Sequence, residues 1–354
     1  MAVAIRLLIA VALIFTFAAC ESDDSDDSEV VTITVAAPQD VTATTRAVSG
    51  SNESTVQDLL VLIFNNKGDI IGYTYGSYSI ASGKSVSVSV KTRKATGCTV
   101  YVVANAGTTS GMEAFSSVRT KAAFDALYAN VSSAKALGDA NSLLMFGKIT
   151  NFSTTSKGSV SLRRLSAKTE LSIGVGSGIT LDSYQLCHAP LSAYYVDDKT
   201  TYVDNKPTGT ASPKGYGDFP VVSPSATATT VKATYYLYES LVGTGKNTNS
   251  DGWKGRYKAK APANATYLVI KAHTASWKST YYVYLGGKTL SSATNTSYDY
   301  TDYTIYRNTD YKVTVTLSGS GSAEDGYRVD YDARVLMTGN TLQGWTSGSA
   351  NINM

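Results

Sequence analysis

The feature that most constrains this chain is a series of short segments in which apolar and polar residues alternate. One of them, residues 86–90, reads Val-Ser-Val-Ser-Val, and related patterns recur over most of the 354 residues. Alternation places every second side chain on one face of a β-strand, so that one face is buried and the other hydrated. Tyrosine is abundant, with 25 Tyr against 8 Phe, and charged residues make up only 17%. These features predict a mainly β fold and exclude a helical bundle, a coiled coil and a disordered chain.

Further strands are expected where branched and aromatic residues form runs bounded by turn residues. Residues 59–64 (Leu-Leu-Val-Leu-Ile-Phe) are apolar throughout, which predicts a strand covered on both faces. A single helix is expected between Met112 and Asn130, where apolar residues approximate a helical spacing. The other expected strands span residues 30–35, 70–75, 86–90, 100–103, 160–162, 171–173, 232–238, 266–272, 280–285, 303–306, 311–317 and 328–337.

The spacing of the strands predicts two consecutive β-sandwich domains. Four of the seven prolines fall between Lys206 and Ser225, in a polar stretch that also carries glycine and serine. Such a stretch is typical of a domain boundary. The predicted domains are therefore residues 47–205 and residues 206–354.

Residues 1–20 resemble the signal peptide of a bacterial lipoprotein. Arg6 precedes an apolar run of secretory length, which is too short to span a membrane comfortably, and Ala18 and Ala19 lead directly into Cys20. In a lipoprotein, Cys20 becomes the acylated first residue and anchors the chain in a membrane. An ordinary signal peptide that ends in cysteine is the alternative.

An acidic run occupies residues 21–29 and predicts a solvated tether. Its position directly after the cysteine resembles the export signal of surface lipoproteins in the Bacteroidetes phylum. That resemblance implies a surface-exposed protein held in the outer membrane through lipid on Cys20.

The alternating strand at residues 30–35 places Val31, Ile33 and Val35 on one face. A polar, threonine-rich stretch follows and ends at Arg46, an accessible site for a trypsin-like protease.

Few residues support catalysis or metal binding. The chain has two histidines and three cysteines, no Gly-x-Ser-x-Gly motif and no metal-binding spacing, so we expect no enzyme, no cofactor and no metal site. Cys98 and Cys187 each lie in a strand-like context, where a disulfide and two buried free thiols are equally compatible with the sequence. The formal net charge of +3 is too small to indicate a nucleic-acid partner.

Several segments together resemble the fimbrillins, the subunits of type V pili of Bacteroidetes, and the resemblance covers nearly the whole chain after Cys20. The segments are ESTV at 53–56 leading into LLVLIFNNKGDIIGYTY at 59–75, VYVVANAG at 100–107, LRRLSAKTEL at 162–171, ATYLVIKA at 265–272 and YRNTDYKVTVTL at 306–317.

The resemblance implies a lipoprotein precursor with two β-sandwich domains of Ig-like or transthyretin-like Greek-key type, with one or two short helices in the first. It also implies maturation by proteolysis after an arginine that follows an N-terminal strand. Arg46 matches that position, which makes Ala47 the new N-terminus and residues 21–46 an acidic tether plus a removable strand.

Release of residues 30–35 would open an apolar groove with unpaired backbone, which a strand of a neighbouring subunit could fill. The candidate donor strand spans residues 328–345, and the alternative is that it is simply the last strand of the second domain. Its groove-facing side chains would be Val329, Tyr331, Ala333, Val335 and Met337.

The expected function is therefore a structural pilus subunit in a surface fimbrium, which polymerises head to tail with copies of itself or related pilins and contributes to adhesion. An anchor or tip subunit is the first alternative. A monomeric glycan-binding surface lipoprotein is the second, with Tyr298, Tyr300 and Tyr303 as the candidate surface for a host or bacterial ligand.

Overall fold

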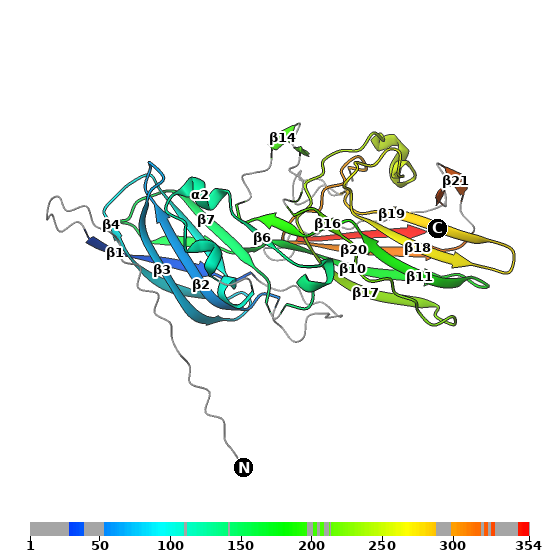
Figure 1. The fold of residues 1–354 in the computed structure, drawn as a ribbon, viewed down its shortest axis with the longest axis horizontal. Coiled ribbons are helices and arrows are strands. Elements are labelled where there is room, and N and C mark those ends of the chain that lie inside the picture. The colour runs from blue at the N-terminus through cyan, green and yellow to red at the C-terminus, as the bar shows by residue number, and fades with distance from the viewer. Residues whose placement is uncertain are drawn as a thin grey trace, which may run out of the picture.

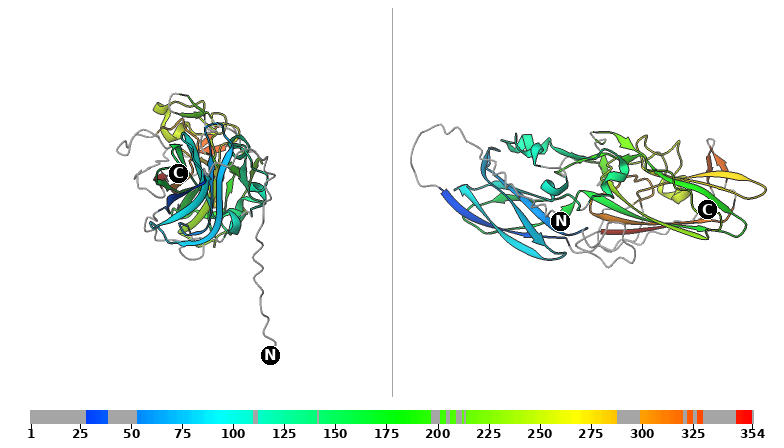
Figure 2. Two further views of the ribbon diagram at one scale, coloured as in Figure 1. Left: turned by 90° about the vertical axis from the view of Figure 1, so that its left-hand side faces the viewer. Right: turned by 60° about the horizontal axis from the view of Figure 1, so that its bottom comes forward.

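The computed structural model describes residues 28–38, 53–109, 112–140, 142–196, 201–203, 206–208, 212, 214–287, 299–319, 322–324, 327–329 and 346–353. The described residues form two lobes that lie end to end and consist mainly of strands (Figures 1 and 2). The mainly β fold is therefore confirmed. Among these residues, no helix has the length and apolar character needed to cross a membrane.

The first lobe, residues 28–164, contains one large sheet and several short helices. Its strands are β1 (Ser28–Ala36), β2 (Val56–Phe64), β3 (Ile70–Ile80), β4 (Ser85–Arg93), β5 (Cys98–Ala104), β6 (Tyr128–Asn130), β7 (Met145–Phe152), β8 (Gly158–Ser161) and β9 (Arg163–Arg164). Its helices are α1 (Ala106–Thr109), η1 (Glu113–Phe115), α2 (Lys121–Asp125) and η2 (Ala134–Leu137).

Eight of these strands form one sheet in the order β8-β1-β4-β3-β2-β5-β7-β9. The described residues of β3 and β4 pair at a single position, Gly72 with Thr92, so the sheet bends there and its two halves face each other as a sandwich. A Cβ atom at Gly72 would lie 2.8 Å from Thr92 Cβ, so this close approach requires glycine. The inner core between the halves combines apolar side chains from both ends of the strand order.

The outer face of β2 and β5 carries a second core. Leu59, Val61 and Ile63 point into the inner core, whereas Leu60 and Leu62 point outward against α2, η1 and residues of the second lobe. Every residue of 59–64 is at most 4% exposed. The expectation of a strand covered on both faces is confirmed.

The single helix expected between Met112 and Asn130 is wrong. The segment forms η1 and α2 instead, with Thr120 capping α2 through a hydrogen bond that its Oγ1 accepts from the Ala123 amide. At the start of α2 the backbone bonds to the β2–β3 turn: the Lys121 amide donates to the Gly68 carbonyl at 2.7 Å. This pairing takes donors that a continuous helix would need.

The second lobe begins at residue 166. Its strands are β10 (Ser166–Val175), β11 (Thr180–Cys187), β12 (Ala189–Pro190), β13 (Ser192–Tyr194), β14 (Thr201–Val203), β15 (Lys206–Thr208), β16 (Tyr216–Gly217), β17 (Thr230–Tyr238), β18 (Tyr267–His273), β19 (Lys278–Tyr284), β20 (Thr309–Leu317), β21 (Ser322–Glu324), β22 (Tyr327–Val329) and β23 (Thr346–Asn353), with η4 at Asn249–Gly255.

The two largest sheets of this lobe have the strand orders β17-β10-β20-β23 and β11-β18-β19. β10 runs antiparallel to β17 and parallel to β20, and β20 runs parallel to β23. Apolar side chains from both sheets form a third core. The lobe is a second sandwich.

The domain boundary expected at residue 206 does not match the strand pairing. β10 and β11 both precede residue 206, yet they pair with β17, β20 and β18 of the second lobe. The proline-bearing stretch therefore connects parts of one lobe. Residues 303–306 also differ from expectation, because only Ile305 forms a β-bridge there, with Ser240.

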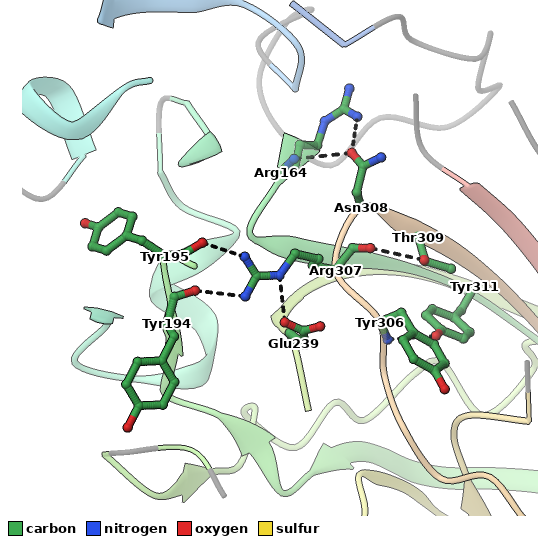
Figure 3. Close-up of polar contacts among 9 residues, drawn as sticks. All are labelled: Arg164, Tyr194, Tyr195, Glu239, Tyr306, Arg307, Asn308, Thr309 and Tyr311. Carbon is green, nitrogen blue, oxygen red and sulfur yellow. Dashed lines mark hydrogen bonds and ion pairs between the residues drawn. The ribbon is translucent and has the colours of Figure 1, made fainter. Parts of the chain in front are cut away.

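Buried polar contacts lie at the junction of the two lobes (Figure 3). The Arg307 guanidinium donates to Glu239 Oε2 at 2.6 Å and to the carbonyls of Tyr194 and Tyr195, each at 2.8 Å. The side chains of Arg307 and Glu239 are 5% and 8% exposed. Tyr194 belongs to β13, which pairs with β6 of the first lobe, so Arg307 holds the strand that connects the lobes.

We predict that Arg307→Met lowers the free energy of unfolding by about 3–5 kcal/mol, because it leaves the Glu239 carboxylate buried without its cation. Urea unfolding of the purified protein measures the change. The control is Lys135→Met, which breaks an ion pair with Asp139 whose side chains are 58% and 57% exposed. The control should change stability little, and equal losses in both variants would contradict this role of Arg307.

Candidate functional site

The first strand lies inside the sheet of the first lobe. β1 pairs with β4 in antiparallel register over all nine of its residues and with β8 in parallel register over residues 33–36. It therefore separates two strands that are not otherwise neighbours in the strand order. Loss of β1 would leave ladder hydrogen-bonding groups unpaired on both β4 and β8.

The side chains of β1 complete the inner core. Val31 is 2% exposed, Ile33 and Val35 are each 0% exposed, and all three belong to the same cluster as the inward residues of β2, β5 and β7. Val30, on the opposite face, is 65% exposed. β1 thus covers an apolar cleft, as its alternating sequence requires.

Glycine at position 158 makes room for this strand. Gly158 is the register partner of Ile33, and a Cβ atom there would lie 2.7 Å from Ile33 Cδ1 and 2.9 Å from Ile149 Cδ1. The isoleucine from β1 can therefore pack directly against the backbone of β8.

The segment that follows the strand is fixed at both described ends. The Gly83 amide donates to the Pro38 carbonyl at 3.0 Å, next to the turn between β3 and β4. On the other side, Arg164 Nε donates to the Glu53 carbonyl at 2.8 Å, and its guanidinium also bonds Ser54 Oγ and Asn308 Oδ1. Arg164 is fully buried.

Three expected processing residues, Cys20, Arg46 and Ala47, lie outside the described residues. So do most of the expected donor strand and Tyr298. Of the five donor side chains only Val329 falls in a described strand, β22, which pairs with β21. Tyr331, Ala333, Val335 and Met337 lie outside the described residues.

The expected tyrosine surface is not a surface at Tyr303, which is 0% exposed. The buried Arg256 guanidinium lies 3.9 Å from the centre of the Tyr303 ring, and it donates to the carbonyls of Tyr300 and Asp302. Tyr303 OH donates to Asn247 Oδ1 at 3.0 Å. Tyr303 therefore lies in a buried cluster of loop residues, and the expectation that it forms part of a ligand surface is wrong.

Both cysteines resolved by the structure are buried free thiols rather than a disulfide. Burial, assisted by the charge of Asp218, raises the pKa of Cys187 to about 12, which makes this thiol unreactive at neutral pH. Among the described residues, no group of His, Cys, Asp and Glu is arranged to hold a metal ion.

The Arg164 and Arg307 contacts were not expected from the sequence, although two of the fimbrillin-like segments carry them. The segment at 162–171 supplies Arg164 and the segment at 306–317 supplies Arg307 and Asn308, and the two segments meet at the lobe junction (Figure 3). Asn308 has a φ of 55°, a left-handed conformation that asparagine tolerates better than most residues.

Comparison with known proteins agrees with this architecture. The family model of the major fimbrial subunit protein (FimA) matches residues 30–182, which run from β1 into β11, and a domain of unknown function matches residues 235–315. None of the curated proteins matches the sequence.

Among solved structures, the tip fimbrial protein Mfa3 from Porphyromonas gingivalis has a TM-score of 0.51 at 17% identity, with 92% of this chain and 99% of that chain covered. A candidate cell adhesion protein from Bacteroides eggerthii has a TM-score of 0.50 at 18% identity, with 94% and 100% covered. These likenesses show a shared fold.

The part of the chain that matches the major fimbrial subunit family thus contains β1 and the sandwich that β1 completes.

In the buried cluster around Tyr303, the carboxyl group of Asp302 predicts that the free energy of unfolding depends on pH. Burial raises the pKa of Asp302 to about 6, although hydrogen bonds from Thr304 and Tyr306 and the charge of Arg256 act in the opposite direction. The folded protein therefore holds this proton more tightly than the unfolded chain. The free energy of unfolding should fall by about 3 kcal/mol as pH rises from about 4 to about 6, and change little from this source above that.

Asp302→Asn removes this titration, so the variant should lack that part of the decrease. Urea unfolding of both proteins across this pH range measures the difference in slope. Parallel curves for the wild type and the variant would contradict a raised Asp302 pKa.

Proposed function

We propose that the chain is the precursor of a polymerising fimbrial subunit, in which β1 holds a groove closed until proteolysis after Arg46 releases it. In this proposal the chain is exported as a lipoprotein, with lipid on Cys20 and residues 21–29 as the surface export signal. It faces the medium at the outer membrane before it enters the fimbrium.

The observation that carries the proposal is the burial of Val31, Ile33 and Val35 between β4 and β8. Each apolar side chain contributes roughly 1.5–3 kcal/mol when it is fully buried, so the vacated groove would lose about 5–9 kcal/mol of apolar contact before ladder hydrogen bonds are counted. An isolated subunit with that groove open is unstable relative to one in which another strand fills it. A strand from a neighbouring subunit would restore both the core and the ladder.

The processing site fits this role by its position between fixed ends. Pro38 and Glu53 are both held by hydrogen bonds, so a cut after Arg46 divides the chain between two anchored points. After the cut only noncovalent contacts retain β1, whereas the new N-terminal segment stays attached through Arg164.

The proposed donor is the segment 328–345 of another copy or of a related pilin. Because each subunit then receives one strand and donates another, the contact is heterologous and builds an open filament. An anchor or tip subunit would use the same groove but lack one of the two contacts. The likeness to the tip protein Mfa3 is a likeness of fold and does not choose between these roles.

The test is to treat the purified precursor, without its signal peptide, with trypsin and to run it unboiled in detergent. We expect a ladder of resistant multimers whose subunits begin at Ala47, because strand exchange produces kinetically stable contacts. The control is Arg46→Ala, which should stay monomeric under the same treatment.

Deletion of residues 328–354 should abolish the ladder of a stalk subunit, whereas a tip subunit would still be incorporated by its partners.

A clean cut after Arg46 that leaves only monomers, with β1 still bound, would contradict the proposal. So would multimers of equal yield from the Arg46→Ala variant, since polymerisation would then be independent of this cleavage.

A further inference from the structure

A buried lysine lies at the centre of the first sheet of the second lobe. Lys168 on β10 is 1% exposed, and its register partners are Tyr236 on β17 and Asp310 on β20. Because paired residues of neighbouring strands point to the same face, the Lys168 and Asp310 side chains lie side by side across the sheet.

Two other carboxylates, rather than that of Asp310, form the ion pairs of the lysine. Lys168 Nζ lies 3.1 Å from Glu170 Oε1 and 3.2 Å from Glu53 Oε1. Tyr236 OH donates to the same Glu53 oxygen at 2.5 Å. Glu53 therefore covers part of this cluster.

The third carboxyl group has no comparable partner. Asp310 is 6% exposed, and its Oδ1 atom is buried without a hydrogen bond. An ionised carboxylate left in that state is costly. The arrangement thus brings together an amine, a carboxylate in contact with it, and a second carboxyl group that burial favours in its neutral form.

We propose that Lys168 Nζ and Asp310 Cγ form an intramolecular amide, an isopeptide bond between β10 and β20, with Glu170 as the group that accepts and returns the proton. This proposal does not depend on the pilus function.

The reaction balances without any co-reactant. The Lys168 ammonium gives a proton to the Glu170 carboxylate, and the resulting amine attacks Cγ of the protonated Asp310. The tetrahedral intermediate then loses the Asp310 hydroxyl, which leaves as water with a proton delivered by Glu170. The nitrogen then gives its second proton to the Glu170 carboxylate. The products are one amide, one water molecule and a neutral Glu170, which releases its proton to solvent.

The electrostatics of the cluster agree with these roles. Burial, together with the charges of Glu170 and Glu53, raises the pKa of Asp310 to about 7, although Lys168 and Lys312 act in the opposite direction. Asp310 is therefore substantially protonated at neutral pH, which is the form that can lose a hydroxyl. Burial alone would lower the pKa of Lys168, but the charges of Glu53 and Glu170 outweigh this effect and raise the pKa. The ammonium proton must therefore pass directly from Lys168 to Glu170 within their ion pair.

Asp310 is the preferred partner over the two glutamates for this reason. Glu53 and Glu170 are ion-paired with the lysine, and an ion-paired carboxylate is a poor acceptor for a nucleophile. The bond would join two parallel strands that are far apart in sequence, at the end of the second lobe that meets the first.

Peptide mapping of the full chain tests the proposal. Trypsin does not cleave after an acylated lysine, so the wild type should yield a branched peptide that joins residues 165–199 to residues 308–312. Its mass should be lower than the sum of the two linear peptides by one water. Linear peptides that end at Lys168 and that contain an unmodified Asp310 would overturn the proposal, and so would a link from Lys168 to either glutamate.

Three variants distinguish the roles of Lys168, Asp310 and Glu170 in the reaction. Lys168→Arg should give only linear peptides, and Asp310→Asn should give the same branched peptide with loss of ammonia instead of water. Glu170→Gln keeps both reacting groups and should reduce the branched fraction at least tenfold. A branched peptide in the Glu170→Gln variant at the wild-type yield would remove Glu170 from the mechanism and overturn that assignment.

Discussion

The structure depends on one arrangement: a strand near the N-terminus that lies at an interior position of a sheet, between two other strands, instead of at an edge. β1 supplies three buried side chains to the inner core and pairs with β4 and β8 at once. A strand in that place cannot leave without exposing apolar surface and two rows of backbone groups. In the proposed function, stability of the first lobe and its capacity to accept another strand are therefore two consequences of the same contacts.

The second constraint is the polar junction between the lobes. Arg164 and Arg307 are buried, and each satisfies several carbonyl or side-chain oxygens from segments distant in sequence (Figure 3). Glu53 joins this junction to the Lys168 cluster. Glu53 is thus held against the second lobe, so release of β1 need not disturb this contact between the lobes.

The sequence predicts the strands well because burial shows directly in local alternation, as at residues 30–35 and 59–64. It fails where the outcome depends on distant partners. Nothing local indicates that β10 joins the second lobe, that the backbone near Lys121 bonds Gly68 in place of a continuous helix, or that Tyr303 packs under a buried arginine. Arg164 and Arg307 also look like ordinary surface charges in the sequence, because the oxygens that bind them come from elsewhere in the chain.

The central claim is that β1 is a removable part of its own sheet, and hydrogen exchange of β4 tests it most directly. The amides of Ser85–Arg93 that pair with β1 lie in the β1–β4 ladder, so we expect them to be protected in the precursor. Our account predicts that they exchange rapidly once the chain is cut after Arg46 and β1 is removed, and that protection returns in the multimers. Unchanged protection of β4 in a monomer that has lost β1 would contradict the account.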